Sequence, residues 1–291
     1  MAFRVNRRPL GEGTLVVEKL PPDPFDHFVR MLAPGHEVIT YGRGRERSWR
    51  VGAVEIDWDE RFLTGKLGWH PRDPEIVPSW SQELKDWPPT AKEPPETLLP
   101  FGFDGEKRLL GVLHDKKSSP TTLAAVFEMI LNENERQFVN PTTEWSVEPV
   151  LDAQEFIEWL HTQDVVEAVA FVARLPNPEP RAQFEELAER LERAHGTEYA
   201  ARMKSKREEG LQNIEEDPEF RQAIAMGEEG FAQLEGRGRR GNRPTHYRQR
   251  EKVASERIPK VPADWETVRA ILKEMVKDRL RRFLLDDDEA A

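Results

Sequence analysis

The architecture of this chain is set by residues 98–176, which open with LLPFGFDGEKRLLGVLH (98–114). The apolar runs on either side of Asp104-Gly105 predict strands at 98–103 and 108–114. An Asp-Gly dipeptide favours the tight turn of a β-hairpin. A hairpin is therefore expected at the start of this region.

A helix is predicted directly after the hairpin, because Ser119 can cap it and Pro120 fits its first position. Its apolar face carries Leu123, Val126, Phe127, Ile130 and Leu131 at helical spacing. A second helix at 152–162 is predicted between strands at 145–151 and 165–175. This order of elements predicts helices on one face of an antiparallel or mixed sheet.

The first 97 residues also mix strands and helix. Strands are predicted at 14–20, 48–57 and 62–69, and Asp23-Pro24 opens a short helix. Residues 69–97 form an excursion rich in proline and tryptophan, with Trp80 and Trp87 between the prolines. Proline removes backbone donors, so long regular elements are not expected there.

Residues 181–291 are interpreted as a helical region. Helices are predicted from residue 181, at 198–212 and at 218–231, and Asp264 caps a last one. The fold class is therefore α+β: an N-terminal and central sheet with helices on one face, then a helical C-terminal region. The expected divisions are 1–97, 98–176 and 181–291.

The composition describes a polar globular chain with a net charge of −11 over 291 residues. There is no cysteine, which excludes disulfides, thiolate metal sites and a cysteine nucleophile. The N-terminal residues lack the apolar core of a signal peptide, and no apolar run is long enough for a membrane helix. A cytoplasmic protein that does not contact membranes is the expectation.

One segment, Gly236–Lys252, is strongly basic although the chain is acidic, with seven Arg or Lys against one Glu. Guanidinium groups match phosphate oxygens, and an aromatic ring can stack on a base. The predicted nucleic-acid-binding residues are Arg237, Arg239, Arg240, Arg243, Tyr247, Arg248, Arg250 and Lys252. His246 is the candidate acid or base for metal-free phosphodiester cleavage. Gly236, Gly238 and Gly241 would let the backbone approach a ligand.

Other interpretations of the basic residues remain open. The Gly236–Lys252 segment is also consistent with a disordered, solvated loop, or with a loop that neutralises acids of the same chain. A smaller cluster, Arg43, Arg45 and Arg47, could extend a basic groove or form the charged tip of a hairpin.

No cofactor or metal site is predicted. The histidines do not stand at the i,i+4 spacing of a helical metal site, and no phosphate-binding or nucleophile motif is present. Glu83-Leu-Lys85 spells a nuclease-type tripeptide but lies in the proline-rich excursion.

The element order across residues 14–175, together with Gly236–Gly241, resembles that of ferredoxin-like RNA-binding proteins of bacterial defence systems, the repeat-associated RNA-binding superfamily of CRISPR complexes. The glycine loop of this chain departs from that pattern, because it lies far from the sheet and precedes a helix. The resemblance implies contact with RNA or single-stranded nucleic acid, a larger assembly, metal-free cleavage and a part in antiviral defence.

Two function classes follow. The first is a protein that binds RNA or single-stranded nucleic acid, a class that includes nuclease-type effectors. The second is a regulatory subunit without nucleic-acid activity, which docks protein partners through its acidic surface and C-terminal helices. The salt dependence of polynucleotide binding distinguishes the two.

Overall fold

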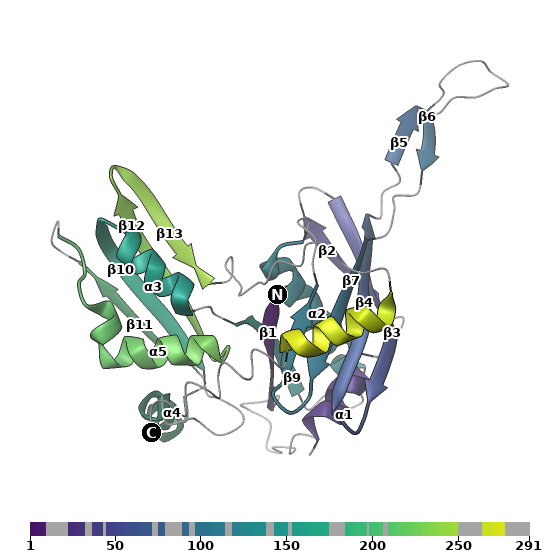
Figure 1. Cartoon of the computed structure of the whole chain (residues 1–291), viewed down its shortest axis with the longest axis horizontal. Coiled ribbons are helices and arrows are strands. Elements are labelled where there is room, and N and C mark those ends of the chain that lie inside the picture. Colours follow the sequence, from purple (N-terminus) through teal and green to yellow (C-terminus); the bar gives the residue numbers. More distant parts are fainter. Residues whose placement is uncertain are drawn as a thin grey trace.

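The structure is a computed structural model of the whole chain. It describes residues 1–9, 23–32, 37–42, 45–71, 75–78, 89–92, 97–113, 118–137, 143–150, 153–174, 184–196, 198–205, 209–249 and 264–276. Two antiparallel sheets, each with its own helices, lie side by side (Figure 1). The α+β class is confirmed.

The first sheet has seven strands in the order β2-β3-β4-β7-β8-β1-β9. Their bounds are β1 Ala2–Pro9, β2 Glu37–Gly42, β3 Arg45–Asp57, β4 Phe62–Pro71, β7 Thr97–Asp104, β8 Leu109–Val112 and β9 Thr143–Pro149. The predicted β3–β4 and β7–β8 hairpins are confirmed. The first strand of the chain, β1, lies between β8 and β9 and joins the hairpin to residues far along the sequence.

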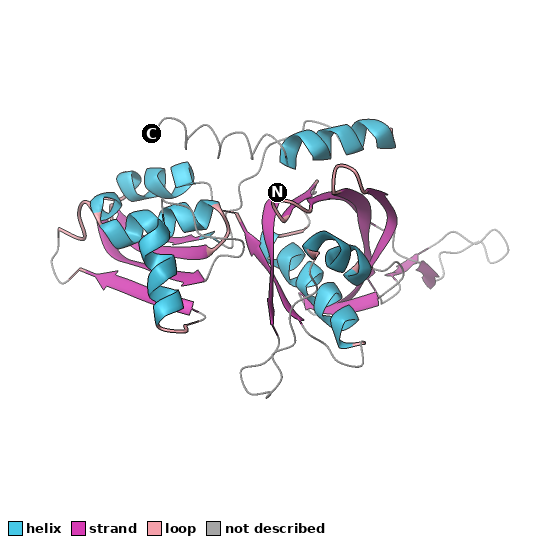
Figure 2. Cartoon of the chain, turned by 90° about the horizontal axis from the view of Figure 1, so that it is seen from below, coloured by secondary structure: helices cyan, strands magenta, loops and turns pink. Residues whose placement is uncertain are grey.

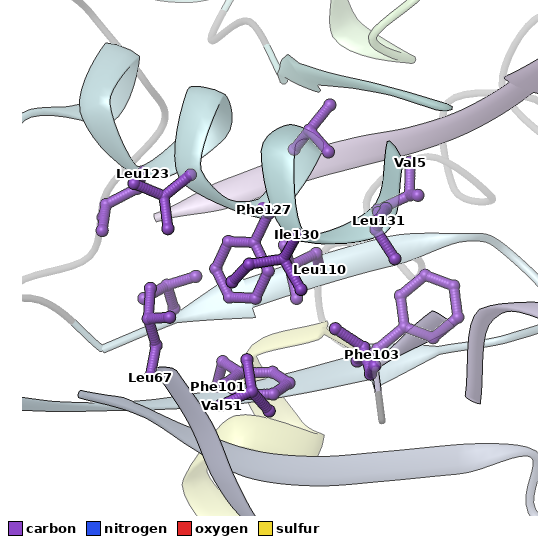
Figure 3. Close-up of a cluster of buried hydrophobic side chains, with 14 of the residues drawn as sticks. Val5, Val51, Leu67, Phe101, Phe103, Leu110, Leu123, Phe127, Ile130 and Leu131 are labelled. Carbon is purple, nitrogen blue, oxygen red and sulfur yellow. The ribbon is translucent and has the colours of Figure 1, made fainter. Parts of the chain in front are cut away.

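Helices α1 (Pro24–Met31) and α2 (Pro120–Arg136) cover one face of this sheet. Their predicted caps are confirmed: the Asp23 carboxylate accepts from the Phe25 amide, and the Ser119 hydroxyl from the Thr122 amide. Figure 3 shows the core between α2 and the strands. It contains Val5, Val51, Leu67, Phe101, Phe103, Leu110, Leu123, Phe127, Ile130 and Leu131, all at most 4% exposed.

The helix at 265–276 covers the opposite face of the same sheet (Figure 2). Its apolar residues Val268, Leu272 and Val276 are buried against the strands. The close approach depends on glycine, because a Cβ at Gly111 would lie 2.4 Å from the Met275 methyl carbon. The cap predicted at Asp264 is present, since its carboxylate accepts from the Thr267 amide at 2.8 Å.

The second sheet has four strands in the order β11-β10-β12-β13. Their bounds are β10 Val165–Arg174, β11 Glu198–Lys204, β12 Ala232–Arg240 and β13 Arg243–Arg248. The accompanying helices are α3 (Ala153–Thr162), α4 (Glu185–Arg193), the 3₁₀ turn η2 (Ile214–Glu216) and α5 (Pro218–Glu228). All of them contribute to one core against a single face of the sheet, and α3 and α5 lie in front of it in Figure 1.

A buried ion pair links the two sheets. Arg4 of β1 donates from Nη2 to Glu229 Oε2 at 2.8 Å and from Nε to the Glu229 carbonyl at 2.6 Å. The Gln249 side chain adds a second link, because it donates to the Pro149 carbonyl while it accepts from the Leu234 amide. Pairing and hydrogen bonding compensate the cost of burying these polar groups.

The expected divisions of the chain need correction. The first sheet combines strands from 1–97 and 98–176, whereas β10 and α3 belong to the second sheet. The helices at 119–134 and 152–162 therefore do not share a sheet face as predicted. A ferredoxin-like arrangement is not confirmed, because the described helices and strands of the second sheet follow the order α, β, α, β, α, β, β, with η2 before the third helix.

The helical interpretation of 181–291 also needs correction. The predicted helix at 198–212 is wrong, since residues 198–204 form β11. Exposure alternates along this strand, which is the period of a sheet rather than a helix. Apart from Tyr199, the residues of β11 are Glu, Ala, Arg, Met and Lys, which have high helix propensity, so tertiary pairing overrides local preference here.

The excursion at 69–97 contains a small hairpin of β5 (Glu75–Pro78) and β6 (Pro89–Lys92), which projects from the first sheet in Figure 1. Trp80, Trp87 and the predicted strand at 14–20 lie outside the described residues. None of the helices in the described part of the chain is long and apolar enough to cross a membrane.

Candidate nucleic-acid interface

The basic segment forms the β12–β13 hairpin rather than a loop between helices, which corrects the prediction. Residues Gly241-Asn242 make the two-residue turn, with Arg240 paired to Arg243. Gly241 has φ 58°, a left-handed conformation that glycine adopts without strain. A Gly-Asn turn between alternating residues is a hairpin signal that the sequence itself contains.

Side chains of the hairpin alternate between the two faces of the sheet. Gly236, Gly238 and Tyr247 face the helices, whereas Arg237, Arg239, His246 and Arg248 are exposed. Arg237 lies opposite His246. Since opposite residues in an antiparallel pair point to the same side, these basic groups share one face. None of the described helices packs on this side of the second sheet, and we call it the open face.

The edge strand β11 adds further basic residues to the open face. Arg202 lies opposite Ala170 of β10, and Lys204 lies opposite Ala168. On the other side of β10, Ala168 lies opposite Arg237. Ala168 therefore lies between Lys204 and Arg237, whereas Ala170 lies between Arg202 and the exposed Glu235. Sequence reasoning missed Arg202 and Lys204, because their segment was interpreted as a helix.

One carboxylate holds two of the predicted arginines. Glu167 lies at an irregularity in the β10–β12 register, between Val166 and Ala168. Its Oε1 is 2.9 Å from Arg239 Nε and its Oε2 is 3.1 Å from Arg237 Nε. Both guanidinium groups remain about half exposed, at 45% and 59%. Glu167 therefore orients the arginines and lowers the positive charge around them.

The tip of the hairpin is fastened to the connection between α3 and β10. The Asp164 carboxylate accepts from the Gly241 amide, and its own amide donates to the Arg239 carbonyl at 2.9 Å. The neighbouring Gln163 side chain accepts from the Thr245 hydroxyl. These bonds give Arg240 and Arg243, which are exposed at the tip, a fixed backbone.

Tyr247 does not belong to the interface, and this part of the prediction is wrong. It is 1% exposed, and its ring packs 4.9 Å from Phe156 and 5.8 Å from Trp159, measured between centroids. The predicted role of Gly236 is corrected in the same way. A Cβ there would lie 2.3 Å from the Trp159 ring, so the glycine makes room for a helix side chain and not for a ligand.

The remaining predicted residues divide into three groups. His246 is exposed on the open face beside Arg237. Outside the described residues lie Arg250, Lys252 and Arg43. Arg45 is described only as a member of β3. Arg47 lies on the first sheet, with its guanidinium 4.3 Å from the centre of the Trp69 ring. Arg45 and Arg47 lie on β3 of the first sheet, so these two members of the cluster do not extend the open face.

A buried pair of ionisable side chains, His27 of α1 and Glu135 of α2, lies on the first sheet, away from the open face. His27 Nε2 is 2.8 Å from Glu135 Oε2, and both residues are buried. Trp145 Nε1 donates to the same carboxylate oxygen at 3.1 Å. Burial lowers the pKa of His27, although Glu135 opposes this shift. These contacts hold α1 and α2 together and give the pair a structural role.

Within the described ranges, no three His, Asp or Glu side chains gather closely enough to hold a metal ion. Glu83 and Lys85 lie outside those ranges.

Comparison with known proteins relates the larger part of the chain to a protein family. The family model described as Domain of unknown function (DUF4747) matches residues 79–277, a span that includes the whole second sheet. No curated protein matches the chain. No solved structure matches it.

Proposed function

This chain belongs to the DUF4747 family, a domain of unknown function, and we propose that its open face binds nucleic acid through the phosphate groups. The observation that carries the proposal is the gathering of Arg202, Lys204, Arg237, Arg239 and Arg248 on one uncovered sheet face of an acidic chain. A local basic surface on a chain of net charge −11 is an electrostatic footprint for a polyanion.

The chemistry of the face favours phosphate contact over base recognition. Among the described strand residues, Phe171, Tyr199 and Tyr247 all belong to the helix-covered core. The described strands of the second sheet therefore present guanidinium and ammonium groups on this face, beside the carboxylates of Glu167, Glu198 and Glu235, but no Phe, Tyr or Trp on which a base could stack. Such contacts position a nucleic acid without reading its sequence. The ligand class that we propose is RNA or single-stranded nucleic acid, in the setting of a bacterial defence system.

The test compares two variants with the same change in net charge. The open-face variant replaces Arg237, Arg239, Arg240 and Arg243 by Ala. The control variant replaces four exposed arginines of α1, α2, α4 and α5 by Ala: Arg30, Arg136, Arg193 and Arg221. Fluorescence anisotropy with labelled single-stranded RNA, single-stranded DNA and duplex measures the affinity of each.

We expect the open-face variant to lose binding and the control to stay within about threefold of the unaltered protein, because only long-range charge differs there. Equal loss in both variants would contradict the proposal, since the effect would then come from net charge alone. Absence of binding by the unaltered protein at low salt would also contradict it. That result would favour the second class, a protein-docking subunit.

A second candidate activity, metal-independent cleavage of RNA, rests on His246. Its imidazole is exposed on the open face and lies opposite Arg237, where a bound phosphate would be within reach of a proton donor. Cleavage of labelled RNA in the presence of EDTA should vanish in His246→Ala while affinity stays within about twofold. Cleavage that persists in His246→Ala would remove this residue from the chemistry.

A further inference from the structure

The outer edge of β11, on the side away from β10, has no role in the proposed nucleic-acid binding. Within the described part of the chain, β11 pairs only with β10 and forms one border of the second sheet. Its side chains alternate regularly over Glu198–Lys204. The opposite border, β13, carries Pro244, which cannot donate to a neighbouring strand. A regular edge without proline is a template for pairing with another strand.

Hydrogen-bond directions along β11 identify the backbone groups at its outer edge. The Ser205 amide donates to the Glu167 carbonyl at 2.9 Å, so residue 205 points toward β10. Backbone groups alternate along an antiparallel strand. The amides and carbonyls of Glu198, Ala200, Arg202 and Lys204 therefore point away from β10.

The charges of β11 are complementary to those of a second β11 strand that runs antiparallel to it. In an antiparallel pair centred on Ala201, Glu198 lies opposite Lys204 of a second copy, and Ala200 lies opposite Arg202. Every residue in these pairs has outward backbone groups, as a hydrogen-bonded register requires. Opposite charges then meet at both ends of the pair on the open face, where Glu198 also accepts from Arg174 Nε of its own chain at 2.7 Å. Opposite charges stabilise cross-strand pairs.

We propose that β11 pairs with β11 of a second copy of this chain, forming a two-fold dimer with a continuous eight-stranded sheet. The proposal goes beyond nucleic-acid binding and does not rest on it. The pairing joins the two open faces side by side. A single seven-residue edge buries less surface than a standard interface, so the dimer should be weak, with a Kd on the order of 10 to 100 µM.

Sedimentation velocity on the full chain tests the proposal over a concentration series from about 1 to about 300 µM. We expect the average mass to rise from monomer to dimer. Ala200→Pro should stay monomeric over the same range, because proline removes an outward donor and leaves the β10 ladder intact. An unaltered chain that stays monomeric throughout, or a dimer unaffected by Ala200→Pro, would overturn the proposal.

Exchanging the charges at positions 198 and 204 tests the proposed register of the β11–β11 pair independently of any folding defect. Lys204→Glu places two acids opposite each other at both ends and should weaken the dimer at least about fivefold. Adding Glu198→Lys restores opposite charges across the two-fold axis and should recover the dimer. Failure of the double variant to recover it, with an unchanged circular dichroism spectrum, would exclude this register.

Discussion

Replacing Tyr247 by Ala separates a structural from a ligand-binding role for the aromatic residue of the basic hairpin. The ring is 1% exposed and contacts Phe156 and Trp159 in the core of the second sheet. Truncating a fully buried aromatic residue costs about 3 to 5 kcal/mol, because apolar burial is removed and a cavity remains. Tyr247→Phe keeps the ring and should cost less than about 1.5 kcal/mol.

Urea unfolding followed by circular dichroism measures the effect. With an m-value of about 2 kcal/mol/M, the Ala variant should lower the midpoint of the affected transition by about 1.5 to 2.5 M. The Phe variant should move it by less than about 1 M. A Tyr247→Ala protein of unaltered stability but without nucleic-acid affinity would refute the packing argument. The ring would then act on the ligand, as the basic segment alone predicts.

Two further predictions concern single charged groups. Glu167→Gln should raise nucleic-acid affinity about two- to fivefold at low salt, because a carboxylate beside Arg237 and Arg239 repels phosphate. Fluorescence anisotropy measures this affinity. Weaker binding by the variant would show that the orientation Glu167 gives the two arginines outweighs its repulsion of phosphate. Burial lowers the pKa of His27 in the folded protein, Arg7 and Arg30 lower it further, and Glu135 opposes the shift. Protonation therefore favours the unfolded chain, and the free energy of unfolding should fall as pH drops below about 6.5. Chemical unfolding at pH 7.5, 6.0 and 5.0 checks this sign, and His27→Gln should flatten the profile over this range.

Local signals were enough to predict much of the fold. Asp23 and Ser119 cap their helices as expected, and Asp104-Gly105 turns between β7 and β8. In each case the information lies within a few residues of the element. The predictions of α4 and α5 rested on helical spacing of apolar residues and are also confirmed.

The errors came from partners that are distant in sequence. β1 carries polar residues such as Arg4 and Asn6, and it becomes a central strand only because β8 and β9 pair with it. The β11 segment has helix-forming residues, and its strand depends on β10. The burial of Tyr247 requires Trp159 of α3, some ninety residues earlier. The basic residues of β12 and β13 could be predicted, but not Arg202 and Lys204 of β11, the strand that completes their face.

The salt dependence of nucleic-acid binding tests the central claim most directly. The plot of log K against log salt concentration should have a slope of about −3 or steeper, since each phosphate contact with a single strand contributes about −0.7. Replacing Arg237, Arg239, Arg240 and Arg243 by Ala should make the slope shallower, by about 0.7 for each of these arginines that binds a phosphate of a single strand. A slope near zero in the unaltered protein, or the same slope in both proteins, would contradict phosphate binding by the open face.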